Sequence, residues 1–120
     1  MTDGVLFDTA GDHHDREGHL YQCGYRGEPT FVSEYGGIQW SSDRKGWGYG
    51  EAPKTEKEFI DRFTRLTEAL IQNKKMFGLC YTQLTDVEQE QNGLYTYDRR
   101  PKFAPEVFRR VLSQKAAIEE

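Results

Sequence analysis

The sequence of 120 residues has only two cysteines, Cys23 and Cys80, and no long apolar run. Two cysteines do not supply the disulfide framework of a small secreted domain. Cys80 stands inside an apolar stretch, so we expect it to be a buried thiol. No stretch approaches the ~20 apolar residues of a membrane-spanning helix, and the start lacks the apolar region of a signal peptide. We expect a soluble protein and favour the cytoplasm, although an upstream signal would be missed if the chain is a fragment.

Positive charge is also in short supply. The 16 Lys and Arg against 20 Asp and Glu give a net charge of −4, and no window is strongly basic, which argues against nucleic-acid binding. Hydrophobic residues make up only 36%, yet seven Phe, seven Tyr and two Trp are more aromatics than a disordered chain carries. This length suits one domain, so the composition predicts a single folded segment over residues 1–120.

The chain divides into a loop-rich lead-in and two strand–helix units. Residues 1–28 are polar with scattered glycines, which predicts loop with at most a brief helical turn. Residues 29–34 fit a strand. A capping box at Thr55 and Glu58 opens a helix that should end near Asn73.

The second unit follows the same order. Residues 76–84, "MFGLCYTQL", predict a strand covered on both faces. Asn92-Gly93 is a candidate hairpin turn. Pro105 suits the first position of a last helix, whose apolar face would be Val107, Phe108, Val111 and Leu112. Strand–helix–strand–helix order over residues 29–120 predicts an α/β fold with parallel strands and outer helices.

Polar side chains stand at the carboxyl ends of both predicted strands. In "PTFVSEYGGIQW" the carboxylate Glu34 ends an apolar strand and is followed by Tyr35 and two glycines, and Gln83 ends the second strand. Parallel sheets bind their ligands at the carboxyl ends of strands. The position of Glu34 therefore predicts a role in chemistry.

These residues also resemble a known family. "PTFVSEYGGIQW" and "MFGLCYTQLTDVEQEQNGLYTYDRRPKFAPEVFRRV", within residues 24–112, resemble the carboxyl-terminal part of the catalytic domain of glycoside hydrolase family 2, which includes β-galactosidases, β-glucuronidases and β-mannosidases. The resemblance implies a (β/α)₈ TIM barrel, of which this chain would hold the last two to three βα units. "SEYGG" corresponds to the end of the seventh strand and the run from Tyr81 to Arg99 to the eighth.

The resemblance also implies a mechanism. Glu34 would be the nucleophile of a retaining β-glycosidase of β-galactosidase type, which hydrolyses O-glycosidic bonds with two carboxyl groups about 5 Å apart. The family's acid/base glutamate lies near the fourth strand, and nothing here corresponds to it. A full barrel needs roughly 250 residues, so the isolated chain should be inactive. Its uncovered sheet edges should make it self-associate. Gln83 stands where many relatives have a tryptophan under the sugar, and a glutamine there would bond to sugar hydroxyls instead of stacking.

Several other side chains are candidate sugar contacts. Tyr35 follows the nucleophile, and Trp40 and Trp47, with Tyr49, lie in the long loop 36–54, as a sugar-stacking platform or as anchors of that loop. Asp86 would contact sugar hydroxyls or structure its own loop. Glu88 and Glu90 are expected to be solvated or to structure the loop.

Two other kinds of site are weaker. "GDHHDREGH" has the ligand types of a metal site, but no predicted element fixes their geometry, so we expect no metal or other cofactor. Ser33 lacks the G-x-S-x-G context of a hydrolase serine. The alternative to a glycosidase is a non-catalytic α/β module that binds carbohydrate or protein.

Overall fold

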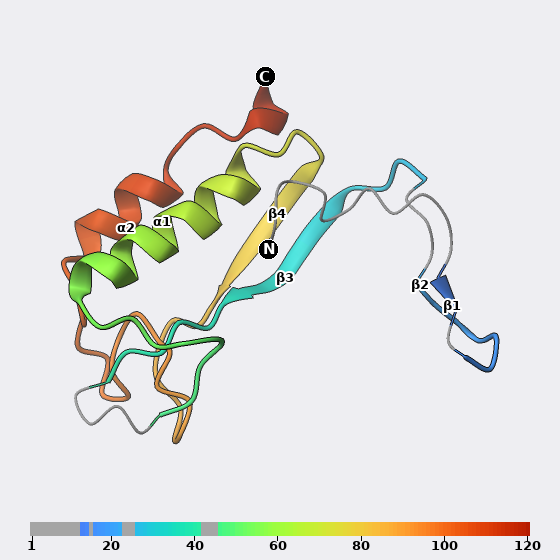
Figure 1. Cartoon of the computed structure of the whole chain (residues 1–120). Coiled ribbons are helices and arrows are strands. Elements are labelled where there is room, and N and C mark those ends of the chain that lie inside the picture. The colour runs from blue at the N-terminus through green and yellow to red at the C-terminus, as the bar shows by residue number, and fades with distance from the viewer. Residues whose placement is uncertain (1–12, 15, 23–25, 42–45) are drawn as a thin grey trace.

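The computed structural model describes residues 13–14, 16–22, 26–41 and 46–120, and it is a mixed α/β fold (Figure 1). Two strands are parallel neighbours and two helices accompany them. The elements in chain order are β1 (His13–His14), β2 (Leu20–Gln22), β3 (Thr30–Gly36), α1 (Glu56–Ile71), β4 (Met76–Thr82), α2 (Pro105–Leu112) and a 3₁₀ helix (Ala117–Glu119).

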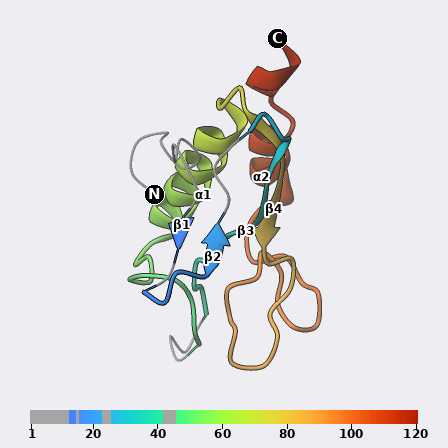
Figure 2. The same ribbon diagram turned by 90° about the vertical axis from the view of Figure 1, so that its right-hand side faces the viewer.

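β3 and β4 form the parallel pair that the strand–helix order predicts. Their register runs from Thr30 opposite Met76 to Gly36 opposite Thr82, with irregularities between Thr30 and Phe31 and between Val32 and Tyr35. β3 continues two residues beyond its predicted end, so Glu34 lies inside the strand, two residues before its last residue. The loops that follow β3 and β4 leave the same end of the sheet (Figures 1 and 2).

α1 begins and ends close to the predicted limits because its start is capped. Thr55 Oγ1 accepts a hydrogen bond from the Glu58 backbone N at 3.1 Å, as in a capping box. The Glu58 carboxylate accepts from Lys54 N at 2.7 Å instead of from the cap residue. The buried face of the helix is made by Phe59, Phe63, Thr67, Leu70 and Ile71.

α2 starts with Pro105 at its first position, as predicted, and lies beside α1 (Figure 1). Phe108 and Val111 are buried. The prediction that Leu112 belongs to the buried face is wrong, because this side chain is 44% exposed at the last helical position.

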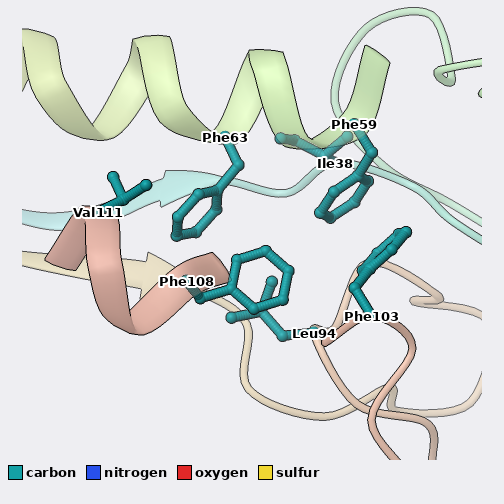
Figure 3. Packing of buried hydrophobic residues seen from close by; sticks show 7 residues of the cluster. All are labelled: Ile38, Phe59, Phe63, Leu94, Phe103, Phe108 and Val111. Carbon is teal, nitrogen blue, oxygen red and sulfur yellow. The ribbon is translucent and has the colours of Figure 1, made fainter. Parts of the chain in front are cut away.

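The main hydrophobic core lies at the carboxyl end of the strands. Aromatic rings from α1 and α2 face one another there (Figure 3). Phe59 and Phe103 stack with centroids 4.5 Å apart, and Phe63 meets Phe108 edge to face at 4.8 Å. The buried members are Ile38, Phe59, Phe63, Leu94, Phe103, Phe108 and Val111. A second, smaller cluster of Tyr35, Leu70 and Met76 lies between α1 and the sheet.

The other face of the β3–β4 sheet is open within the described residues, which corrects two expectations. β4 was predicted to be covered on both faces and Cys80 to be buried, yet Cys80 is exposed. Phe31 lies across Gly78, and a β-carbon added to Gly78 would come within 2.5 Å of the Phe31 ring. The Phe31 side chain is 55% exposed. An apolar run of this length occurs both in strands covered on two faces and in strands covered on a single face, so the sequence does not tell them apart. Cys23 lies outside the described residues.

The lead-in contains strands that the sequence did not predict. β1 and β2 pair antiparallel, with His13 opposite Gln22, and lie apart from the α/β unit in Figure 1. Such short strands depend on backbone hydrogen bonds and need no alternation of apolar residues, so the loop prediction for residues 1–28 was wrong at this point. Its parts at 1–12, 15 and 23–25 lie outside the described residues.

The segment after β4 is a folded loop and not the predicted hairpin. Its tight turn is at Val87–Glu90, where the two residues exchange backbone hydrogen bonds of 3.1 and 2.8 Å. Asn92 is fully buried and therefore does not form an exposed hairpin turn. No helix in the described ranges combines the length and apolar character of a membrane span.

Candidate functional site

Glu34 is exposed near the carboxyl end of β3, where the sequence predicts chemistry. Its carboxylate lines a hollow of about 790 Å³, which we call the β3 hollow. The hollow runs along β3 and extends to α1. Its lining includes Phe31, Glu34, Tyr49, Glu51, Arg62 and Leu66.

The carboxylate of Glu34 has a hydrogen-bond donor from the loop after β3. The Tyr49 hydroxyl donates to Glu34 Oε1 at 3.1 Å. This hydrogen bond, together with the negative charge of Glu34, raises the pKa of the Tyr49 hydroxyl. The phenol therefore remains a donor at neutral pH.

The two glycines after Tyr35 are required by close approach of side chains. Both have positive φ, +96° at Gly36 and +58° at Gly37, which disfavours other residues. A β-carbon on Gly36 would come within 2.2 Å of the Tyr81 ring, and one on Gly37 within 2.1 Å of the Tyr49 ring. The glycines thus let the chain turn after Glu34 and make room for two tyrosines.

Tyr35 is a structural neighbour of Glu34 whose ring is turned into the fold. It is 6% exposed, and its hydroxyl lies 2.9 Å from Thr67 Oγ1 on α1. Burial raises the pKa of the Tyr35 hydroxyl. A substrate contact by Tyr35 stays a prediction; the contacts seen here fasten β3 to α1.

The two tryptophans of the loop occupy different environments. Trp40 is half-buried against Phe103, at a centroid distance of 5.3 Å, and Phe59, which favours the anchor interpretation. Trp47 is 49% exposed and meets Tyr49 edge to face at 4.9 Å. Trp47 is therefore the tryptophan that is available to stack on a ligand.

Gln83 follows β4 and is half-buried in a polar network. Its Nε2 donates to Asn92 Oδ1 at 2.7 Å and to the Glu90 carbonyl at 3.2 Å. These contacts fix the loop after β4. Recognition of sugar hydroxyls by Gln83 stays a prediction.

Asp86 holds its loop through a buried ion pair. Its Oδ1 lies 2.7 Å from Lys102 Nζ and accepts from Gly93 N at 2.9 Å. The Asp86 and Lys102 side chains are 12% and 6% exposed. Burial lowers the pKa of Lys102, while the contact with Asp86 opposes that shift. Of the two roles left open for Asp86, these contacts favour the loop-structuring one.

Three side chains near Glu34 or its loops were not predicted to be part of the site. Arg62 and Glu51 line the β3 hollow, and Arg62 Nη1 donates to the Glu51 carbonyl at 2.6 Å. Lys102 ties Asp86 to the Trp40 carbonyl. Apolar periodicity places Arg62 on the outer side of α1, but no sequence signal links Lys102 to a carboxylate 16 residues away.

The histidine-rich segment 11–19 falls partly outside the described residues. Within the ranges that the structure describes, no three His, Cys, Asp or Glu side chains gather as metal ligands would.

A scan against protein-family models finds no match to the chain, and a search of curated proteins finds none either. Function is therefore inferred from the residues and their geometry.

Proposed function

We propose that this chain is the carboxyl-terminal part of a (β/α)₈ barrel and supplies the nucleophile, Glu34, of a retaining β-glycosidase of β-galactosidase type. The proposal combines the resemblance of residues 24–112 to glycoside hydrolase family 2 with the surroundings of Glu34. A carbohydrate is the substrate, and the reaction needs no cofactor.

The observation that carries the proposal is the position of Glu34. A carboxylate that is exposed, lies at the carboxyl end of a parallel strand, lines a hollow and accepts a hydrogen bond from a phenol has the access and orientation of a nucleophile. A carboxylate retained only for stability would be expected to pair with a cation, whereas among the described residues the hydrogen-bond partner of Glu34 is the hydroxyl of Tyr49.

The proposed step uses the carboxylate directly. A carboxylate oxygen of Glu34 bonds to the anomeric carbon, and the bond from that carbon to the leaving oxygen breaks with its electron pair on the oxygen. A second carboxylic acid protonates the leaving oxygen. The same group, now a carboxylate, then removes a proton from water, whose oxygen displaces Glu34 from the sugar and regenerates both carboxyl groups.

The second carboxyl group is proposed to come from polypeptide upstream of this chain. Glu51 also lines the β3 hollow, so it is the candidate within this sequence that must be tested against that assignment. It is exposed and lies in the loop before α1 and not at a strand end.

The arrangement of layers is compatible with the proposed barrel. The helices lie on one side of the β3–β4 sheet, and the other face carries Phe31, Gly78 and Cys80 without cover from described residues. In a barrel this uncovered face would be the interior, which side chains from other strands fill. Parallel sheets are otherwise rare with one face open.

Labelling of the nucleophile tests the proposal. A polypeptide that joins this chain to the remaining strands is treated with a mechanism-based fluorosugar, and the labelled peptide is identified by mass spectrometry. We expect the label on Glu34, and we expect Glu34→Gln to lower turnover by about 10⁴-fold or more. A label on another residue, or full turnover by Glu34→Gln, would refute the role of Glu34.

Glu51→Gln is assayed beside it to locate the second carboxyl group. We expect this variant to keep turnover within a few-fold of the unsubstituted enzyme. A loss as large as that of Glu34→Gln would place the second carboxyl group inside this chain.

The exposed pair of Trp47 and Tyr49 favours a second candidate function, a carbohydrate-binding module without catalysis. Calorimetry on the chain of 120 residues distinguishes the two. Sugar binding by this chain alone, with no turnover after it is mixed with the rest of the barrel, would favour the module. Turnover that appears only on mixing would favour the glycosidase.

A further inference from the structure

The Tyr49 side chain reaches Glu34 because two backbone contacts hold its segment in place. Tyr49 N donates to the Gly37 carbonyl at 2.7 Å, and Trp47 N donates to the Gln89 carbonyl at 2.7 Å. The segment is thereby attached to the loops that follow both parallel strands. These contacts hold the backbone from which the Tyr49 ring projects.

Packing around the ring restricts it further. It lies over Gly37, in the space a β-carbon would fill, and the Trp47 ring meets it edge to face at 4.9 Å. A phenol held in this way offers its hydroxyl from a constant direction. One oxygen of the Glu34 carboxylate accepts from it, and in the described part of the chain no second donor to Glu34 is seen.

We propose that Tyr49 is a positioning residue for Glu34: its hydroxyl holds one carboxylate oxygen and leaves the other oriented for attack. The inference rests on the proposed function of Glu34 and adds a residue from a part of the loop for which stacking or anchoring was expected. A free carboxylate at a strand end rotates about its side-chain bonds. Restricting that rotation raises the fraction of molecules in a near-attack geometry.

Two measurements test the inference. One tests the hydrogen bond between Tyr49 and Glu34, and the other tests the effect of that bond on the reaction of Glu34. The first uses the chain itself, with tyrosine labelled with ¹³C at Cζ, and follows the Tyr49 resonance, assigned by its absence in Tyr49→Phe. The contact with Glu34 raises the pKa of Tyr49. Glu34→Gln should therefore bring it down toward the ordinary value of 10.0. An unchanged titration in Glu34→Gln would overturn the contact, and with it the inference.

The second measurement follows the rate at which the fluorosugar labels Glu34 in the complete barrel. Tyr49→Phe keeps the ring and removes the hydroxyl. It should slow labelling about tenfold, which is the rate effect expected from the loss of one charge-assisted hydrogen bond at a partly exposed site. Its kcat should fall by a similar factor while KM changes little. Tyr97→Phe is the matched control, because Tyr97 is 75% exposed and lies outside the β3 hollow.

The possible results are distinguishable. Slower labelling in Tyr49→Phe with Tyr97→Phe unchanged supports the inference. Labelling of Glu34 at equal rates in Tyr49→Phe and the unsubstituted enzyme overturns the inference and leaves the proposed function intact. Failure of the unsubstituted enzyme to label at Glu34 overturns the proposed function itself, and with it the role of Tyr49.

Discussion

Lys102 and Asp86 form an ion pair that joins the two loops at the carboxyl end of the sheet. Lys102 Nζ lies 2.7 Å from Asp86 Oδ1 and donates to the Trp40 carbonyl at 2.7 Å. The lysine comes just before α2, the aspartate follows β4, and Trp40 follows β3. One ammonium group therefore contributes to the connection between the loop after β3 and the loop after β4.

Removing this ammonium should destabilise the protein strongly. Lys102→Met keeps a similar length but leaves the buried carboxylate of Asp86 without its cation, which costs about 3 to 5 kcal/mol. Urea denaturation followed by circular dichroism measures the change in the free energy of unfolding. Lys57→Met is the control, because the Lys57–Asp61 side chains are 83% and 51% exposed, and a loss of no more than about 1 kcal/mol is expected.

A second substitution tests the physical reason. Adding Asp86→Asn to Lys102→Met removes the unpaired charge and keeps an acceptor for Gly93 N, so part of the lost stability should return. If the double variant is no more stable than Lys102→Met, the unpaired charge is not the cause.

Gly37→Ala should displace Tyr49 from Glu34. The added β-carbon meets the Tyr49 ring at 2.1 Å, whereas Gly50, also at positive φ (+69°), has no atom within 4 Å of an added β-carbon. Gly50→Ala therefore carries only the left-handed backbone strain, about 1–2 kcal/mol. Only Gly37→Ala should also lower the pKa of Tyr49, as read by NMR. If Tyr49 titrates equally in both variants, the position of its ring does not depend on the absence of a β-carbon at Gly37.

Alkaline pH should destabilise the fold through buried phenols. Burial raises the pKa of Tyr35 and of Tyr81 above the ordinary value of 10.0, so the folded chain keeps protons that the unfolded chain releases. Their contribution to stability is complete below pH 10.0 and is lost as the pH rises through the folded-state pKa values. Urea denaturation at a series of alkaline pH values measures this slope.

Tyr81→Phe removes one of these protons, so its free energy of unfolding should decline less steeply above pH 10.0. Tyr97→Phe, at a position 75% exposed, should follow the unsubstituted chain. A slope unchanged by Tyr81→Phe would contradict the role of burial.

The isolated chain is proposed to self-associate through the open face of the β3–β4 sheet. Phe31→Ser removes the exposed ring that lies across Gly78 and should shift sedimentation velocity profiles toward the monomer. Leu84→Ser is the control, because Leu84 is 66% exposed but follows β4. A well-folded monomer before substitution, or an equal effect of both changes, would contradict a specific role for this face.

The sequence predicted α1, β3, β4 and α2 because each carries a local signal. Thr55 and Glu58 mark a helix start, Pro105 suits a first helical position, and apolar runs of strand length mark the two strands. The exposure of Cys80 and the β1–β2 pairing had no such signal. Both depend on what lies across from the residue in space, which composition and periodicity do not record.

The candidate site also has features that follow from the sequence pattern and features that do not. The placement of Glu34 at a strand end follows from pattern alone, since a polar residue ends an apolar run. The hydrogen bond from Tyr49 and the ion pair of Asp86 with Lys102 join residues 15 and 16 positions apart through loops. Loops have no regular period from which contacts between their residues could be predicted, so only the three-dimensional structure identifies these partners. The exposed Trp47 and half-buried Trp40 were likewise indistinguishable as sequence letters.

The core of seven buried residues at the carboxyl end of the strands has a consequence for the order in which the molecule opens. Loops are commonly the first parts to exchange their amide hydrogens with solvent, yet here the loop residues Ile38, Leu94 and Phe103 are buried members of that core. Local unfolding should therefore start outside this core, and the amides of these three loop residues should be among the last to exchange.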